Sequence, residues 1–201
     1  MPTTKKIAKN KKVAEKAPAK ASKKPAAAKK GAPAAAKKGA PAASASRALE
    51  GKKAPAFQLA DADGKTVALK DLVGQRNLVL YFYPKDMTPG CTIEACSFRD
   101  NDADIRAMGA QIIGISADSS ASHVKFRDKH SLNFPLLSDP ENKVTRAYGV
   151  YKMKSLYGRE FMGIERTTVV IDKSGVVRKV FAKMKVNGHT EEVIEALKSL
   201  G

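Results

Sequence analysis

Apolar residues after about position 54 gather into short runs separated by turn residues. The uninterrupted runs at 78–83 and 111–116 are typical of strands that are buried on both faces of a sheet. The pattern around Asp63-Gly64 predicts a hairpin between residues 57–59 and 66–69. A second hairpin is predicted near the C-terminus, where residues 166–172 and 176–182 are joined by Lys-Ser-Gly.

Helical patterns lie between these strands. We predict a helix over about 92–108, a second over 121–130, a short third near 141–148, and a last one over 190–200 whose apolar positions share one face. A short apolar segment, 134–137, separates the second helix from the third. The order is strand-helix-strand-helix, then strand-strand-helix. This order is typical of an α/β fold with helices on both sides of a central sheet, and several such folds share it.

Charge divides the chain into two parts. Residues 1–53 contain 16 Lys or Arg and two acidic residues, whereas the remaining 148 residues contain 21 basic and 18 acidic ones. The first part consists mainly of Lys-Lys pairs separated by Ala, Pro and Gly, so it cannot bury enough apolar surface to offset its ordering entropy. We therefore predict a disordered basic tail over 1–53 and one folded domain over 54–201. No apolar run is long enough to span a bilayer.

The tail has the composition of a polyanion-binding segment, similar to the basic tails of linker histones and bacterial histone-like proteins. Lysines along a flexible chain neutralise phosphates by counterion release and do not read base sequence. No aromatic residue precedes Phe57, so the tail cannot stack on bases. We expect non-specific DNA binding through residues 1–53; the alternative is an extension that only adds solubility.

Two cysteines carry the strongest chemical signal. Cys91 follows a Thr-Pro-Gly turn after the strand at 78–83, so we expect it in the first turn of the next helix. Unpaired N–H groups and the positive end of the helix dipole stabilise a thiolate there. Cys96 lies five residues further on, and a second thiol beside a reactive thiolate is typical of a two-step redox cycle. Without a recognisable secretory signal, we expect a reducing compartment, where such a pair is catalytic more often than structural.

The residues around these cysteines carry a family resemblance. Pro84-x-x-x-Thr88-x-x-Cys91 resembles the active-site signature of the peroxiredoxins. The continuation through Cys96 resembles the peroxiredoxin Q branch, also called bacterioferritin comigratory protein. The resemblance runs from about residue 54 to 200 and includes several separate motifs in the family's order. It implies a thioredoxin-like fold, with a central mixed sheet flanked by helices, among the α/β folds that the element order allows.

The same resemblance implies a thiol peroxidase that acts on hydrogen peroxide and organic hydroperoxides. Cys91 would attack the peroxide and become a sulfenic acid, which Cys96 would resolve as an intramolecular disulfide. Thr88 would hydrogen-bond the peroxide and the thiolate, and Pro84 would cover the thiol. Arg166, in a segment similar to the one that carries the family's active-site arginine, would supply a fixed positive charge in a rigid fork of donors.

The resemblance also implies the reductant and the oligomeric state, whereas the cysteine usage and the basic tail indicate the location. We expect thioredoxin as the reductant, no cofactor, no metal, a monomer, and a cytoplasmic protein that the tail could hold at the nucleoid. His123, His130 and His189 are scattered and complete no Cys/His cluster with metal-ligand spacing.

The spacing of the cysteines has a geometric consequence. Residues five apart on an intact helix have Cα atoms about 8 Å apart, given a rise of about 1.5 Å per residue. A disulfide needs Cα atoms within about 7 Å. We therefore expect the first turns of this helix to unwind when the disulfide forms. Glu94, between the two cysteines, is expected to have a structural role, since an acid early in a helix suits the dipole.

Two other functions compete with a peroxidase. In one, the tail is the principal function and the chain is a nucleoid or DNA-associated protein with the folded domain as an anchor. In the other, the domain is a thioredoxin-like disulfide exchanger. The exchanger predicts Cys-x-x-Cys, whereas four residues separate the two cysteines here.

Overall fold

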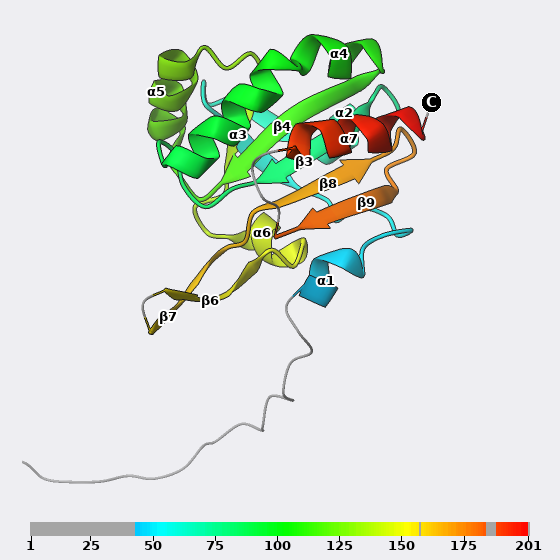
Figure 1. The fold of residues 1–201 in the computed structure, drawn as a ribbon. Helices are drawn as coiled ribbons and strands as arrows, with labels where there is room; N and C mark the ends of the chain where they lie inside the picture. Colours follow the sequence, from blue (N-terminus) through cyan, green and yellow to red (C-terminus); the bar gives the residue numbers. More distant parts are fainter. Residues whose placement is uncertain (1–42, 157, 184–187, 201) are drawn as a thin grey trace, which may run out of the picture. The chain divides into compact units, whose positions relative to one another are not determined.

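A central sheet of seven strands organises the folded part of the chain (Figure 1). The computed structural model describes residues 43–156, 158–183 and 188–200, so most of the predicted tail lies outside the described residues. The strands follow the order β2-β1-β5-β4-β3-β8-β9, and β6 and β7 form a separate hairpin. The strands are β1 (Gln58–Asp61), β2 (Thr66–Ala68), β3 (Asn77–Phe82), β4 (Ala110–Ser116), β5 (Leu136–Ser138), β6 (Tyr151–Leu156), β7 (Arg159–Ile164), β8 (Thr167–Ile171) and β9 (Val177–Ala182).

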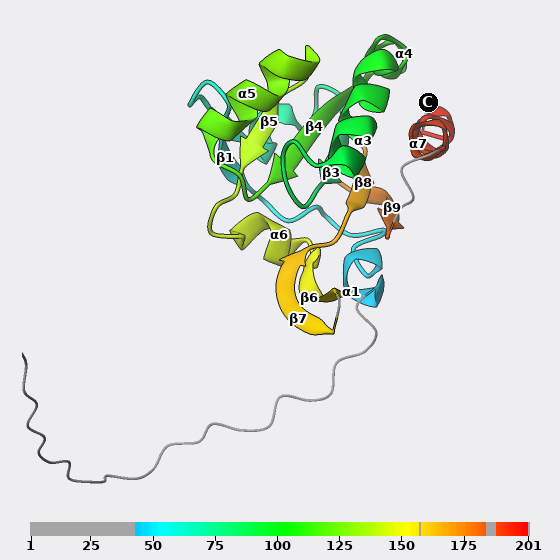
Figure 2. The ribbon, with the colours of Figure 1, turned by 60° about the vertical axis from the view of Figure 1, so that its left-hand side comes forward.

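Helices cover both faces of this sheet, as two views of the ribbon show (Figures 1 and 2). Strands β3, β4 and β5 run parallel, and β8 joins β3 in the antiparallel direction, so the sheet is mixed. This is the thioredoxin-like α/β fold expected from the family resemblance. The helices are α1 (Ala43–Arg47), α2 (Leu69–Leu72), α3 (Pro89–Asp100), α4 (Asp102–Ala107), α5 (Ser120–His130), α6 (Lys143–Ala147) and α7 (His189–Lys198).

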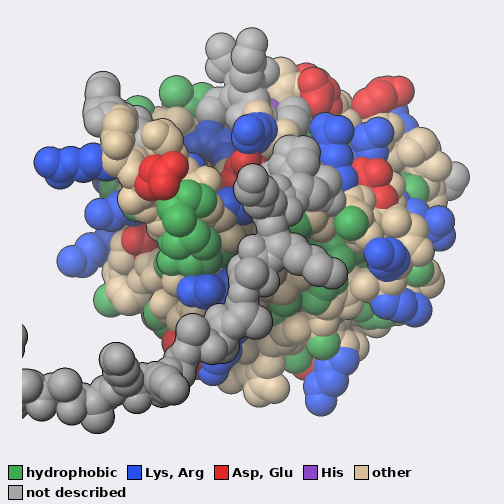
Figure 3. Space-filling view, turned by 90° about the horizontal axis from the view of Figure 1, so that it is seen from below, with side chains coloured by type: hydrophobic (Ala, Val, Ile, Leu, Met, Phe, Trp, Pro, Cys, Tyr) green, Lys and Arg blue, Asp and Glu red, His purple; other side chains and the backbone are tan. Residues whose placement is uncertain are grey.

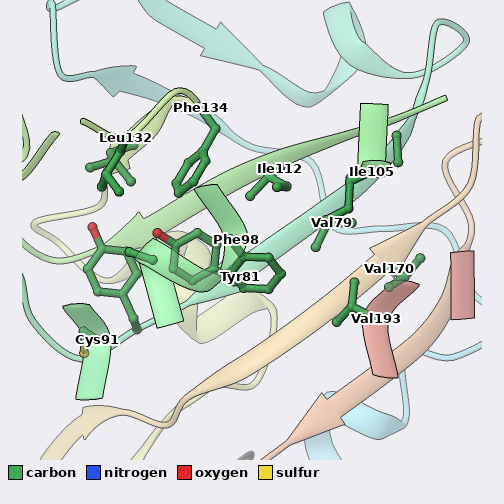
Figure 4. Close-up of a cluster of buried hydrophobic side chains, with 14 of the residues drawn as sticks. Val79, Tyr81, Cys91, Phe98, Ile105, Ile112, Leu132, Phe134, Val170 and Val193 are labelled. Carbon is green, nitrogen blue, oxygen red and sulfur yellow. The ribbon is translucent and has the colours of Figure 1, made fainter. Parts of the chain in front are cut away.

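The apolar run of β3 supplies both halves of the core. Its side chains alternate between two faces, as the two-residue period of a strand requires. Val79 and Tyr81 point into one cluster, which α3, α4, α5 and α7 cover (Figure 4). Leu78, Leu80 and Phe82 point into the other cluster, which includes residues of α2 and α6. Burial on both faces explains why this strand has no polar face.

The predicted order of elements is confirmed, except that α1 and α2 were not predicted and that two further regions differ. The helix predicted over 92–108 is two helices, α3 and α4, which are separated at Asn101, where the backbone leaves helical geometry with φ −102° and ψ 4°. The hairpin of β6 and β7 was not predicted. It pairs Tyr151 with Ile164 and continues outward to Leu156 and Arg159.

The boundary between tail and domain is corrected by the structure. Residues 43–53, predicted as tail, include α1 and a segment that pairs with β9, the edge strand. Gly51 N donates to Val177 O at 2.8 Å, Val177 N donates to Lys52 O at 2.9 Å, and Val180 N donates to a Glu50 carboxylate oxygen at 2.7 Å. The prediction followed the lysine count and overlooked Leu49, which packs on the core.

Candidate active site

The predicted cysteine site lies where β3 ends and α3 begins. Pro89 occupies the first turn of α3, where its missing N–H removes no helical hydrogen bond. Cys91 is the third residue of the helix and is only 1% exposed, at the border of an apolar cluster (Figure 4). Thr88 is the N-cap residue, and its hydroxyl donates to the carbonyl of Lys85 at 3.0 Å. The thiol therefore lies in a helical first turn, as the sequence predicted.

Arg166 reaches this thiol from a distant part of the chain. It immediately precedes β8, and the antiparallel pairing of Thr167 with Phe82 brings it to the end of β3. Its Nη2 donates to Cys91 Sγ at 3.2 Å and its Nη1 donates to the carbonyl of Gly90 at 3.1 Å. A Cβ atom at Gly90 would lie 3.2 Å from Nη2, so the glycine leaves room for the guanidinium.

Pro84 lies beside a cavity next to this loop. The cavity has a volume of about 370 Å³, and its walls include Pro84, Tyr151, Phe161 and Ile164. The β6–β7 hairpin therefore forms one side of the approach to the loop that carries Pro84 and Thr88. The molecule seen from the side of this hairpin has patches of hydrophobic side chains between its basic ones (Figure 3). Exposed hydrophobic side chains of the hairpin are Met153, Phe161 and Met162.

The loop before α3 is fixed by a buried carboxylate. Asp86 is 4% exposed, accepts hydrogen bonds from Tyr83 Oη at 2.8 Å and Ser122 Oγ at 2.7 Å, and lies 3.0 Å from His123 Nδ1. Burial raises the pKa of Asp86, but the hydrogen bonds from His123, Ser122 and Tyr83 outweigh it and lower the pKa. The next residue, Met87, has a φ of 60°, which side chains other than glycine seldom adopt. These contacts hold a strained loop in place beside Cys91.

A second buried carboxylate follows Cys91 in the chain. Glu94 is one turn further along α3 and is 1% exposed. One of its oxygens lies 3.5 Å from Arg166 Nε and the other 3.9 Å from His189 Nε2, and within the described residues neither oxygen has a hydrogen-bond partner. Burial raises the pKa of Glu94 to about 7, although Arg166 opposes the shift.

His189 carries no positive charge that could compensate the negative charge of Glu94. Burial, followed by repulsion from Arg166, lowers the pKa of His189 to about 4, so the imidazole is neutral at pH 7. Its Nε2 also lies 2.7 Å from Thr168 Oγ1, a much shorter contact than that to Glu94. We therefore regard Arg166 as the cation that faces Glu94.

The sequence did not single out Asp86, it considered His123 only as a metal ligand, and it favoured a structural role over a catalytic one for Glu94. A residue three positions after Cys91 lies on the same face of a helix, so the spacing of Glu94 was a usable signal. Cys96 is half-buried on α3, and both cysteines are free. The structure thus brings Cys91 and Arg166 into contact, places Thr88 and Pro84 in the adjoining loop, and keeps Cys96 on the same intact helix.

The part of the chain that the structure describes offers no group of three His, Cys, Asp or Glu side chains able to hold a metal ion. Two of the three histidines have other neighbours, His123 beside Asp86 and His189 beside Thr168. In the same described ranges, every helix is too short or too polar to cross a membrane.

Known proteins are similar to this chain in sequence and in fold. The family profile of the AhpC/TSA family matches residues 50–180. Peroxiredoxin Bcp of Bacillus subtilis is 49% identical over 150 residues, which cover 75% of this chain and 95% of that protein. Peroxiredoxin Bcp of Escherichia coli is 44% identical over 148 residues, which cover 74% and 94%. The structure of Xanthomonas campestris peroxiredoxin Q superposes with a TM-score of 0.68 at 40% identity, covering 71% of this chain and 90% of that one.

These matches agree with the geometry of a buried thiol, at the start of a helix, that accepts a hydrogen bond from an arginine. The chain therefore belongs to the AhpC/TSA family, as a thiol peroxidase similar to the Bcp and peroxiredoxin Q proteins.

Proposed function

We propose that the chain is a two-cysteine peroxidase in which Cys91 is the peroxidatic residue. The contact of 3.2 Å between Arg166 Nη2 and Cys91 Sγ carries this proposal, because a fixed cation there stabilises both a thiolate and the charge on a peroxide oxygen. The Cys91 thiolate attacks one peroxide oxygen and the O–O bond breaks. The other oxygen leaves with the bonding electron pair, takes up a proton, and departs as water or as an alcohol. Cys91 is thereby oxidised to a sulfenic acid.

Thr88 and Pro84 prepare this attack. In the reduced form the hydroxyl of Thr88 donates to Lys85 O, and its oxygen still has lone pairs that can accept a hydrogen bond from a protonated peroxide. Pro84 covers the thiol. The proposed substrates are hydrogen peroxide and organic hydroperoxides. In support, alkyl peroxide reduction is the activity described for the Xanthomonas campestris bacterioferritin comigratory protein, which is 40% identical to this chain.

Cys96 then resolves the sulfenic acid. Its sulfur attacks Cys91 Sγ, the S–S bond forms, the S–O bond breaks, and hydroxide leaves to become water. Burial of Cys91 and its place on an intact α3 mean that this step requires α3 to unwind locally. An external dithiol returns both cysteines to thiols and becomes oxidised itself; we assign this role to a thioredoxin on the strength of the family resemblance.

Intact mass after one equivalent of hydrogen peroxide tests the cycle. We expect the reduced protein to lose two hydrogens and both sites of thiol alkylation, and a Cys96→Ser variant to stop at the sulfenic acid, with one added oxygen. An unchanged mass with two free thiols would contradict a peroxidase. Turnover with thioredoxin and its reductase, compared with glutathione, then tests the reductant.

A second function, binding of DNA by the basic tail, rests on the charge distribution of the sequence. It would make the chain a peroxidase held at the nucleoid, in the cytoplasm, where it consumes peroxide close to DNA. The test compares the full chain with a variant in which the ten lysines of the five Lys-Lys pairs before residue 42 become Gln. We expect duplex binding to weaken strongly for the variant and with rising salt for the full chain. Equally weak binding by both proteins at low salt would overturn the proposal.

A further inference from the structure

Glu94 lies inside the segment that has to unwind. Residues 91–96 connect the two cysteines along α3, and the carboxyl group of Glu94 points into the protein from the middle of this segment. A buried carboxylate is normally stabilised by several hydrogen bonds, and one without them is strongly disfavoured. Neither oxygen of Glu94 has such a bond among the described residues. The closed helix therefore holds a group that gains hydration whenever the helix opens.

Arg166 compensates this carboxylate only in part. Two of its nitrogens are already used at the first turn of α3, where Nη1 donates to Gly90 O and Nη2 donates to Cys91 Sγ. The remaining Nε lies 3.5 Å from Glu94, which is longer than a normal charge-assisted hydrogen bond of about 2.7–2.9 Å. The single guanidinium of Arg166 thus faces both Cys91 and Glu94, and its shorter contacts are those at the first turn of α3.

Within the described ranges, the other groups that face Glu94 bring no positive charge at neutral pH. From α7, the imidazole of His189 is neutral because burial lowers its pKa to about 4. From β3, Tyr81 is a buried phenol whose pKa is raised above its usual value, chiefly by burial. On α3 itself, Cys91 adds a negative charge when it is a thiolate. Among these groups, Arg166 before β8 is the one cation that faces Glu94.

We propose that Glu94 is a positioning residue for the resolving step: its ionised carboxylate, which lies between the two cysteines in the chain and is buried without a hydrogen bond from the described residues, drives the first turns of α3 to unwind and so brings Cys91 within reach of Cys96. This inference rests on the proposed function, in which Cys96 resolves the sulfenic acid of Cys91. Protonated Glu94 keeps α3 closed, and ionised Glu94 favours the open form, in which water hydrates the carboxylate.

The pH range of the effect follows from linkage. In the closed helix the pKa of Glu94 is raised to about 7, from 4.5 in water, so protons bind more tightly to the closed form. The closed helix therefore has its full stability below pH 4.5 and loses stability as the pH rises to 7. Between pH 5.5 and 7.5 the ratio of open to closed helix should rise on the order of tenfold because of this group.

Rapid quenching of the oxidised protein tests the inference. Reduced full-length protein receives one equivalent of hydrogen peroxide, and the conversion of sulfenic acid to disulfide is timed by mass at pH 5.5 and at pH 7.5. Glu94→Gln is compared with the wild type, and Glu192→Gln, which removes an exposed acid, is the matched control. Any pH effect that the three proteins share cancels in the ratio of their rates.

We expect the rate ratio of wild type to Glu94→Gln to rise about tenfold between the two pH values, in line with the linkage above. The ratio of the wild-type rate to the rate of the control, Glu192→Gln, should be the same at both pH values. A constant ratio for Glu94→Gln as well would overturn the role of Glu94 and leave the two-cysteine cycle intact. Failure of all three proteins to form a disulfide would instead overturn the proposed function.

Hydrogen exchange of the α3 amides in the reduced proteins gives a second readout. Glu94→Gln should be better protected than the wild type at pH 7.5 and similar to it at pH 5. If Glu94→Gln does not fold, Glu94→Met supplies a non-titrating apolar side chain of similar length for both measurements. Equal protection of wild type and variant at both pH values would contradict the inference.

Discussion

One buried carboxyl group precedes Cys91 in the chain and another follows it, and the two behave in opposite ways. Asp86, in the loop before α3, is surrounded by the donors of Tyr83, Ser122 and His123, and its pKa is lowered. Glu94, in the helix after Cys91, has no hydrogen bond within the described part of the chain, and its pKa is raised to about 7. Both groups are almost completely buried, so burial alone does not determine their charge.

Hydrogen-bond donors explain the difference between the two carboxyl groups. They also give Asp86 and Glu94 different mechanical roles. Asp86 fixes the loop that carries Pro84 and Thr88, so the side chains proposed to meet the peroxide stay in place. Glu94 leaves its own helix less stable when it is ionised. The chain before Cys91 is thus held firmly, while the chain after it is ready to open. Substitutions of Asp86 and of Glu94 should therefore change the stability of the protein in opposite directions and by different amounts.

Removal of Asp86 should have the largest effect on stability. Asp86→Ala leaves the hydroxyls of Tyr83 and Ser122 and the imidazole of His123 without their acceptor, which should cost about 3–5 kcal/mol in the free energy of unfolding. Urea denaturation measures this loss. Asp86→Asn, which keeps one acceptor oxygen, should lose less. A loss below about 1 kcal/mol for Asp86→Ala would mean that donors are not what stabilises this loop.

Arg166→Met removes the cation that lies between the thiol and Glu94. We expect the second-order rate constant with hydrogen peroxide to fall about 10²–10³-fold, since the charge on the reacting oxygens loses a preorganised partner. Stopped-flow kinetics measure the fall. Arg166→Lys keeps the charge but lacks the fork, so its rate should lie between those of the other two proteins. A fall of less than about threefold for Arg166→Met would argue against the assigned role.

The dependence of stability on pH should separate the two carboxyls. Because the pKa of Glu94 is raised in the folded protein, stability should increase as the pH falls from 7.5 to 5, by about 2 kcal/mol more in the wild type than in Glu94→Gln. Because the pKa of Asp86 is lowered, its contribution should be lost only at a still lower pH, as it becomes protonated. Denaturation curves at pH 3, 5 and 7.5 would show both trends. If the stability of the wild type and that of Glu94→Gln changed equally with pH, the proposed contrast between Glu94 and Asp86 would be wrong.

The smallest effect is expected at Ser122. Ser122→Ala deletes one of the donors to Asp86 and leaves the other two, so the free energy of unfolding should fall by about 1 kcal/mol. A shift in the urea midpoint measures it. Ser131→Ala, which changes an exposed serine, is a suitable comparison. An effect as large as that of Asp86→Ala would show that the donors act as a single unit.

Much of the framework was predictable because local signals agree with the fold. Uninterrupted apolar runs identified β3 and β4, since a strand that is buried on both faces needs no polar side. The Thr-Pro-Gly turn placed Cys91 in the first turn of a helix. The β6–β7 hairpin lacked such a signal. In β6 the exposed Met153 lies between two lysines, and β7 exposes Phe161 and Met162, so neither strand has a simple alternation of apolar and polar positions.

The electrostatics of the site depended on contacts between distant parts of the chain. The family resemblance suggested Arg166, but its contact with Cys91 follows from the pairing of β8 with β3, across 75 positions of sequence. Burial of Glu94 likewise requires β8 and α7 to cover α3. An acid in the first turns of a helix usually faces solvent, so the local pattern pointed to the dipole and not to a buried carboxyl.

The strip of chain from Glu50 to Lys53 also covers part of the edge strand β9. An uncovered edge strand offers a row of unpaired backbone groups on which another molecule can add a strand. Here Gly51 and Lys52 pair with Val177, and the carboxylate of Glu50 occupies the N–H of Val180. Lysines close to such an edge further repel a second copy. A chain cut at residue 54 would lose this cover, so a truncated form should be more prone to aggregation than one that begins at residue 43.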